Sequence, residues 1–342
     1  MFSAHINACF LFFPRMLIVG ISLWMLSISS ATADEPIEVG ARLKIQQITG
    51  INQREENFGI VGTLIMQWHD PELAAKPGET VAPRRMFPHL TFVNYMMERG
   101  LIWPAYSFYN VQGRVTYQNR LVVIDVNGNV DYIARFTAKF QAPDFDFRHF
   151  PLDEQDFYIK LDLLPRVSRF VLTALPGSGI GDALGEEEWI LEHTETRVTT
   201  HDELGHTASR FVLSFQGERH LNYYLVRMLI PATIIILVSW FTFFLKDYTK
   251  RIDLASGNLL LFIAFNFTVA NDLPRLGYLT LMDTFMLSTF AITGLVVLVN
   301  VWLRRLQNHG KEVLANKLDE FSVWGYPLTF AAAGLSIFIF FY

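Results

Sequence analysis

The chain has 342 residues, of which 51% are hydrophobic and 18% are charged, and its formal net charge is -5 at neutral pH. The negative charge argues against a nucleic-acid-binding surface, and the excess of apolar residues indicates membrane-spanning segments. The apolar residues are concentrated in the last third of the chain, whereas the first two thirds has the composition of a soluble domain. We therefore expect a water-facing domain followed by a membrane domain.

Residues 1–33 have the pattern of a secretory signal peptide. Arg15 precedes an apolar run at 16–28, and 31–33 supplies the small residues that a signal peptidase requires. The run is short for a bilayer span, which favours cleavage over the alternative of an uncleaved anchor helix; Met16 is an alternative start. Cys9, the one cysteine, lies in this segment, so the mature chain is expected to lack disulfides and thiolate metal sites.

Residues 34–219 show the pattern of many short β-strands. Within 131–140, apolar side chains alternate with more polar ones, which is typical of a half-buried strand. Asn127-Gly128 favours a tight hairpin turn and separates this strand from an apolar run at 121–126. Many short strands joined by turns predict a periplasmic β-sandwich. Further elements are expected as strands at 157–163 and 211–215 and as a short helix within 84–98.

Residues 220–342 are expected to form a membrane domain with four helical spans. Each apolar run is long enough to cross a bilayer, and the predicted spans are 221–245, 251–270, 279–303 and 321–342. Basic residues follow the first span and separate the third from the fourth, which predicts that both loops are cytoplasmic. These residues are Lys246, Lys250, Arg251, Arg304, Arg305, Lys311 and Lys317. The β-domain and the end of the chain are then periplasmic, in agreement with the signal peptide.

The second span carries many polar residues, which are costly against hydrocarbon. At alternating steps of four and three residues it presents one stripe: Asp253, Gly257, Leu260, Ala264, Phe267 and Asn271. Several copies around an axis predict a pore with a carboxylate ring that attracts cations and apolar rings that close by dewetting. The alternative is an ordinary helix interface with Asp253 in the headgroup region beside Arg251, and spacing alone leaves both readings open.

Four motifs carry a resemblance to a known family. They are Trp68-His69-Asp70-Pro71-Glu72-Leu73, the loop Phe150-Pro151-Leu152-Asp153, the stretch 218–224 leading to Pro231, and the stretch 251–278. Together and in this order they resemble the pentameric ligand-gated ion channels, the Cys-loop receptor superfamily, in its bacterial branch. The fourth is similar to bacterial channels of the Erwinia type. The chain lacks the cysteine pair that brackets the second motif in animal members.

The resemblance implies a homopentamer whose pore is lined by the same stripe of the second span. It also implies that an agonist binds between neighbouring subunits of the β-domain. Loops at the base of this domain then move the segment between the second and third spans. The implied coupling residues are Glu55, Glu56, Asp153, Arg219 and Pro274. A purely structural salt bridge is the alternative reading of Asp153 and Arg219, and the two readings are compatible.

The agonist pocket departs from the family pattern. Amine agonists are often held by an aromatic cage, but the corresponding positions include Lys44, Thr63 and Leu164, none of which is aromatic. An amine agonist is therefore not expected. The candidate ligand-binding residues are Arg120, Asp162, Leu164 and His201.

Two further features leave alternatives open. Nine histidines suggest proton gating, with scattered surface histidines as the alternative. Glu186-Glu187-Glu188 suggests a calcium site, with a solvated turn as the alternative. Whether the chain binds a metal is therefore unknown.

The chain contains none of the catalytic motifs sought, so we expect a channel with no enzymatic activity and no cofactor. The expected function is a cation-selective ligand-gated channel of the bacterial inner membrane. Its expected partners are its own copies, a small-molecule or ionic agonist, permeant cations and membrane lipid, with no nucleic acid. The alternative is a non-conducting periplasmic sensor. The segment between the third and fourth spans, about 17 residues, disfavours a sensor because it leaves no room for a signalling domain.

Overall fold

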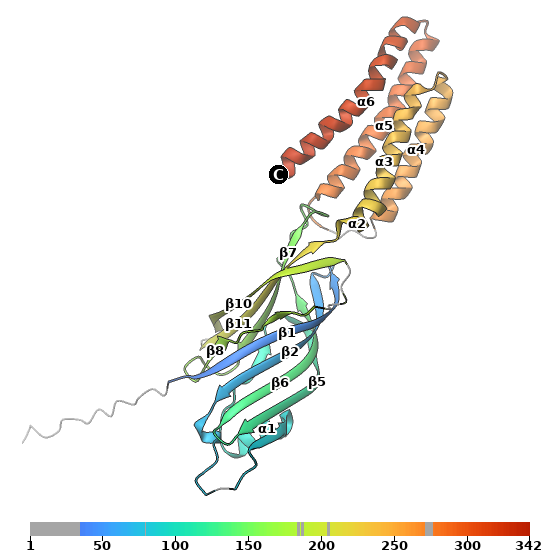
Figure 1. Cartoon of the computed structure of the whole chain (residues 1–342). Helices are drawn as coiled ribbons and strands as arrows, with labels where there is room; N and C mark the ends of the chain where they lie inside the picture. Colours follow the sequence, from blue (N-terminus) through green and yellow to red (C-terminus); the bar gives the residue numbers. More distant parts are fainter. Residues whose placement is uncertain (1–34, 79, 183–184, 186–187, 204–205, 271–275) are drawn as a thin grey trace, which may run out of the picture. The chain divides into compact units, whose positions relative to one another are not determined.

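The first part of the described chain folds into two β-sheets (Figure 1). The computed structural model describes residues 35–78, 80–182, 185, 188–203, 206–270 and 276–342. One sheet has the strand order β3-β5-β6-β2-β1-β8, with β9 also pairing β1; the other has the order β10-β11-β7-β4. The first sheet contains β1 (Ile37–Asn52), β2 (Asn57–His69), β3 (Arg84–Pro88), β5 (Val111–Asp125), β6 (Asn129–Gln141), β8 (Phe170–Ala174) and β9 (Gly179–Ile180). The second contains β4 (Tyr106–Phe108), β7 (Glu154–Leu163), β10 (Trp189–Glu203) and β11 (His206–Arg219).

Period-two alternation explains why these segments form strands with one buried face. In β6 every second side chain is buried: Val130, Tyr132, Ala134, Phe136, Ala138 and Phe140. The turn before β6 contains Gly128 at φ +87°, and a Cβ there would lie 2.3 Å from the carbonyl oxygen of Asp70. Only glycine fits this turn. Strands β5 and β6 pair on either side of it, so the hairpin predicted at Asn127-Gly128 is present.

Aromatic side chains join the two sheets. Phe157 of β7 stacks on Phe215 of β11 with ring centroids 5.0 Å apart, and both rings pack on Phe58 of β2. All three side chains are fully or almost fully buried. Burial of such large rings is the main favourable term holding the sandwich together.

The segment 84–98 differs from the single short helix predicted for it. Residues Arg84–Pro88 pair with β5 as strand β3, and only His89–Glu98 form helix α1. Pro88 disfavours helical geometry at the residue before it, so the helix begins just after the proline. A 3-10 turn, η1 (Pro71–Leu73), follows β2 and is capped by Asp70.

The last part of the described chain is helical (Figure 1). The first span, Leu221–Phe244, comprises α2 (Leu221–Tyr224), a π-helical turn η2 (Leu225–Leu229), α3 (Ile230–Phe241) and a 3-10 turn η3 (Thr242–Phe244). Pro231 lacks an amide hydrogen, which explains why the hydrogen-bond ladder is irregular just before it. The other spans are α4 (Tyr248–Val269), α5 (Leu281–Asn308) and α6 (Glu312–Phe341).

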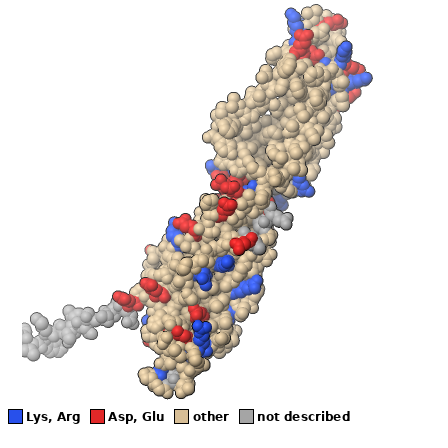
Figure 2. Space-filling view, in the orientation of Figure 1, with Lys and Arg blue, Asp and Glu red and all other residues tan. Residues whose placement is uncertain are grey.

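The third and fourth helices extend beyond the predicted spans. The predicted linker of about 17 residues is a turn at 309–311, with Gly310 at φ +73°. Apolar runs mark only the part of a helix that matches the bilayer, so the polar ends of α5 and α6 were missed. Figure 2 shows the charged side chains of the helices gathered near their ends, with an uncharged surface between.

His89 at the start of α1 lies against aromatic rings of the sandwich. Its ring centroid is 5.4 Å from that of Trp103 and 5.8 Å from that of Tyr132. Among the described residues, its Nδ1 atom has no hydrogen-bond partner. Burial, with the nearby Arg120 charge as the second cause, lowers the pKa of His89 to about 4 from 6.5. The imidazole is therefore neutral at physiological pH.

Protonation of His89 should make the fold acid-sensitive. The unfolded chain binds this proton near pH 6.5, whereas the folded chain resists binding it until about pH 4, so stability falls as pH drops through this window. His89→Phe keeps an aromatic ring but cannot titrate, so its loss of Tm between pH 7 and pH 4.5 should be smaller. The exposed-site control His69→Gln should retain the full loss. An unchanged pH profile in His89→Phe would contradict this account.

Candidate functional site

Arg219, the last residue of β11, forms a buried ion pair with Asp153 of the loop before β7. The Arg219 Nε atom donates to Asp153 Oδ1 at 2.7 Å, and a second guanidinium nitrogen donates to Oδ2 at 3.1 Å. The two side chains are 0% and 1% exposed. The Arg219 guanidinium also lies over the rings of Trp189 and Phe150, at 4.2 Å and 4.7 Å from their centroids. Bidentate geometry and exclusion of water make this pair a rigid connection.

Glu188 and Tyr224 extend this pair into the first span. Arg219 donates to Glu188 at 3.2 Å and to the Tyr224 hydroxyl at 3.0 Å, and this hydroxyl donates to Glu188 at 2.7 Å. Gln53, in the loop between β1 and β2, donates to the same Glu188 oxygen at 2.9 Å. The network therefore joins the β1–β2 loop, the end of β11 and the start of the first span.

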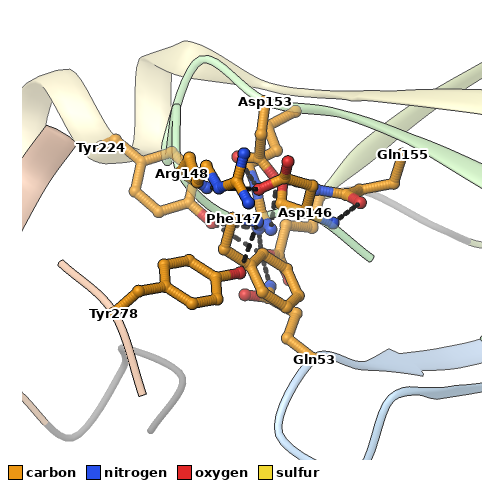
Figure 3. A network of polar contacts seen from close by, with 10 residues as sticks. Gln53, Asp146, Phe147, Arg148, Asp153, Gln155, Tyr224 and Tyr278 are labelled. Atoms are coloured by element: carbon orange, nitrogen blue, oxygen red, sulfur yellow. Dashed lines mark hydrogen bonds and ion pairs between the residues drawn. The ribbon is translucent and has the colours of Figure 1, made fainter. Parts of the chain in front are cut away.

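The loop before β7 also contacts the residues around the start of α5. The amide of Leu281 donates to the carbonyl oxygen of Arg148 at 2.8 Å, and that of Met282 donates to the carbonyl oxygen of Phe150 at 3.2 Å. The Tyr278 hydroxyl accepts a hydrogen bond from the Phe147 amide at 3.1 Å, as Figure 3 shows. The loop is thus held both to the sandwich and to the segment preceding α5.

Gln155 fixes the shape of this loop. Its side chain donates to the carbonyl oxygen of Asp146 at 2.7 Å and accepts from the Asp146 amide at 2.9 Å (Figure 3). It also donates to Asp153 Oδ2 at 2.5 Å. Gln155, at the start of β7, therefore holds the loop in the shape that directs Asp153 towards Arg219.

The remaining candidate coupling residues are placed differently. Glu55 accepts a hydrogen bond from Asn57 at 3.1 Å, and Glu56 takes a left-handed turn conformation with φ 48°. Their loop contributes Gln53, rather than either glutamate, to the described contacts with Glu188. Pro274 and the pore candidate Asn271 lie outside the described residues.

Helix α4 has one face packed against the chain and one face without a covering element. The buried face carries Tyr248, Arg251, Ala255, Asn258, Phe262 and Val269. Asn258 donates to the Ile235 carbonyl oxygen at 2.8 Å and to the Ser239 hydroxyl at 2.5 Å, so α4 is fixed to the first span in rotation. The described residues of the predicted stripe are all exposed: Asp253, Gly257, Leu260, Ala264 and Phe267. The side chains of Leu260 and Phe267 are 66% and 73% exposed.

The ligand-binding candidates are divided between the two sheets. Asp162 of β7 forms a bidentate ion pair with Arg210 of β11, at 2.6 Å for both contacts. The Arg210 guanidinium lies 4.2 Å from the Tyr109 ring centroid, and the His201 ring packs 5.5 Å from the same ring. Leu164 is exposed just after β7. Arg120 lies on β5 in the other sheet, over the Tyr117 ring.

Comparison with known proteins shows that the chain is similar to ligand-gated ion channels. Residues 27–164 match the model of the neurotransmitter-gated ion-channel ligand binding domain. The proton-gated ion channel of Gloeobacter violaceus is 23% identical over 331 residues, which cover 93% of this chain and 87% of that protein. These matches, together with the β-sandwich and the four spans, support a prokaryotic pentameric ligand-gated channel of the Cys-loop superfamily.

Animal members of the channel family match over a smaller part of their length. The γ-aminobutyric acid receptor subunit rho-2 of Mus musculus is 22% identical over 82% of this chain and 62% of that subunit. The γ-aminobutyric acid receptor subunit beta-like of Drosophila melanogaster is 25% identical over 75% of this chain and 54% of that subunit. The relatives are ligand-gated channels rather than enzymes, and the chain is a multi-pass membrane protein of this class.

Several residues that make these contacts were not predicted from the sequence, among them Gln53, Gln155, Glu188, Tyr109 and Arg210. Glu188 was read as part of an acidic turn or a calcium site, although its position next to the buried Trp189 was a signal that its carboxylate lies near the sandwich core. Tyr109 and Arg210 were not singled out. Arg210 lies opposite Asp162 in the register of β11 and β7, and this register is not readable from single strands. For the described residues, no group of three metal-ligating side chains is found.

Removing the Asp153 carboxylate should destabilise this channel subunit strongly. Asp153→Ala leaves Arg219 as a buried charge without its bidentate partner, which typically costs about 3–5 kcal/mol. Asp146→Ala is the matched control, because its pair with Arg148 is exposed and such pairs are worth less than about 1 kcal/mol. We expect a much larger fall in Tm for the purified assembly in the first variant, and equal losses would refute the buried-pair account.

Proposed function

We propose that the chain forms a homopentameric, cation-selective channel of a bacterial inner membrane, with the β-domain in the periplasm. An agonist that binds between neighbouring β-domains opens it. The observation that carries this proposal is the exposed stripe of α4, in which Asp253 and two large apolar residues lie on the face opposite the packed one.

The composition of this stripe favours water on its exposed side. Lipid does not stabilise a carboxylate such as Asp253, and polar positions in a span face protein or a water-filled space. Leu260 and Phe267 lie two and four turns further along the same face. Around a shared axis they form apolar rings, which favour a dry and closed pore until the helices separate. The stripe thus supplies both an ion-selecting ring and a gate.

The junction network supports coupling between the sandwich and the pore. Movement of the sandwich is transmitted by the Asp153–Arg219 pair because neither side chain has room or water to reorient. The loop that carries Asp153 bonds the start of α5, and it also bonds Tyr278, which lies in the segment joining α4 to α5. A shift of this loop therefore displaces that segment and, with it, the end of the pore helix.

The candidate agonist pocket indicates what kind of agonist it would accept. Asp162 is already neutralised by Arg210, so it does not offer a free carboxylate to an amine. We propose a small molecule or ion other than a simple amine, contacting Tyr109 and His201 on one subunit and Arg120 on the next. Protons are a second candidate, since a relative is a proton-gated channel and His89 is held neutral by its surroundings.

A non-conducting sensor is the competing function. The three-residue turn between α5 and α6 holds no signalling domain, which counts against it. Purified protein in planar bilayers decides between the two under a screen of ligands and pH values. Current with a reversal potential at the cation equilibrium value supports the channel, and silence under all conditions supports the sensor.

Asp253→Ala should weaken cation selectivity. Loss of the carboxylate ring removes the negative potential at the pore mouth, so the reversal potential under a salt gradient should move towards zero. Glu312→Ala removes an exposed carboxylate at the start of α6, off the stripe, and should leave the reversal potential unchanged. An anion-selective parent channel, or an unchanged Asp253→Ala channel, would remove the role assigned to Asp253.

Leu260→Ser should make the channel easier to open. A hydroxyl at this ring lowers the barrier to water entry, so the open probability at a fixed stimulus should rise. Leu261→Ser is the control, since Leu261 is also exposed but is turned by about 100° from the stripe. Single-channel recording measures both, and a Leu260→Ser channel that opens less readily would argue against the gate.

A further inference from the structure

Arg251, at the first turns of α4, is a buried cation with an unusually complete set of partners. Its guanidinium donates to both carboxylate oxygens of Asp319 on α6, one of them at 3.0 Å. It also donates to two carbonyl oxygens at the end of the first span, Phe243 at 2.8 Å and Leu245. The residue is 3% exposed, and its guanidinium lies 4.7 Å from the Tyr248 ring centroid.

Asp253 lies on the opposite side of the same helix. Two residues correspond to a rotation of about 200°, so Arg251 and Asp253 point away from each other. Asp253 is exposed, and no ion pair of this side chain is found in the described part of the chain. Arg251 pairs instead with Asp319 of α6.

We propose that Asp319 of α6 is a specificity-determining residue of the channel, although α6 does not contribute to the stripe. It does so by holding the Arg251 charge away from the pore mouth, which leaves the Asp253 ring uncompensated. This inference rests on the proposed function, in which Asp253 selects cations.

The Arg251 guanidinium can lie against Asp319 or turn towards water. Bound to Asp319, the guanidinium is neutralised and its hydrogen bonds are satisfied. Without that carboxylate, a buried and unpaired guanidinium is strongly disfavoured, so the long side chain turns towards water. This end of α4 also carries Asp253, so in the proposed pore a guanidinium that turns towards the water at the helix end adds positive charge beside the mouth, which opposes the Asp253 field and attracts anions.

The decisive variant is Asp319→Asn, which keeps the shape of the side chain and removes its charge. In planar bilayers under a salt gradient, we expect its reversal potential to move from the cation value towards the anion value. The double variant Asp319→Asn with Arg251→Gln should return to the cation value, because the freed charge is absent. Glu320→Gln, which removes a neighbouring exposed carboxylate of α6, should match the parent.

Two electrical outcomes would overturn the proposal. One is an Asp319→Asn channel that keeps the parent reversal potential. The other is a shifted Asp319→Asn channel that the added Arg251→Gln change does not restore, since the Arg251 charge would then not be the cause. If the Arg251–Asp319 pair only held the helices together, this second outcome would be expected, because removing the arginine as well restores no contact.

Chemical labelling tests the same idea without conduction. Phenylglyoxal modifies guanidinium groups that water reaches, and mass spectrometry of the peptide containing Arg251 measures the labelled fraction in the intact, detergent-purified assembly. We expect protection in the parent and labelling in Asp319→Asn. A labelled parent or a protected variant overturns the proposal. A parent that fails to conduct, or selects anions, counts against the proposed function, while the labelling still decides whether Asp319 sequesters Arg251.

Discussion

The contact between Arg219 and Asp153 is the constraint on which the arrangement of this subunit depends. A guanidinium and a carboxylate that are both withdrawn from water are stable only if each satisfies the other. Their geometry therefore fixes the end of β11 relative to the loop before β7. Glu188, Tyr224 and Gln53 then take positions around the same charge, so the membrane span begins at a point defined by the sandwich.

The two buried arginines, Arg219 and Arg251, make the same kind of contacts at two places in the subunit. Arg219 joins a strand, a loop and the first span, and Arg251 joins α4, the end of the first span and α6. In both cases a planar donor with several N–H groups binds a carboxylate by two contacts and lies over aromatic rings. Arginine suits such positions because it stays charged and its donors have fixed directions, whereas lysine offers a single point charge.

The sequence allowed the strands and the membrane-spanning helices to be predicted, because each is a local pattern. The alternation in 131–140 and the Asn127-Gly128 turn are examples that need no knowledge of distant residues. The partners of individual charges were harder to predict. Arg251 pairs with Asp319 of α6, and Glu188, just before β10, joins Arg219 at the end of the neighbouring strand β11. Such pairs depend on register and helix rotation, which single segments do not encode.

The short turn at 309–311 limits how the helices can move relative to one another. A connection of three residues keeps the end of α5 beside the start of α6. Near the same end, Asp319 of α6 holds Arg251 of α4. A displacement of this end of α6 must therefore involve α4 and α5 as well, and the three helices behave as one unit there.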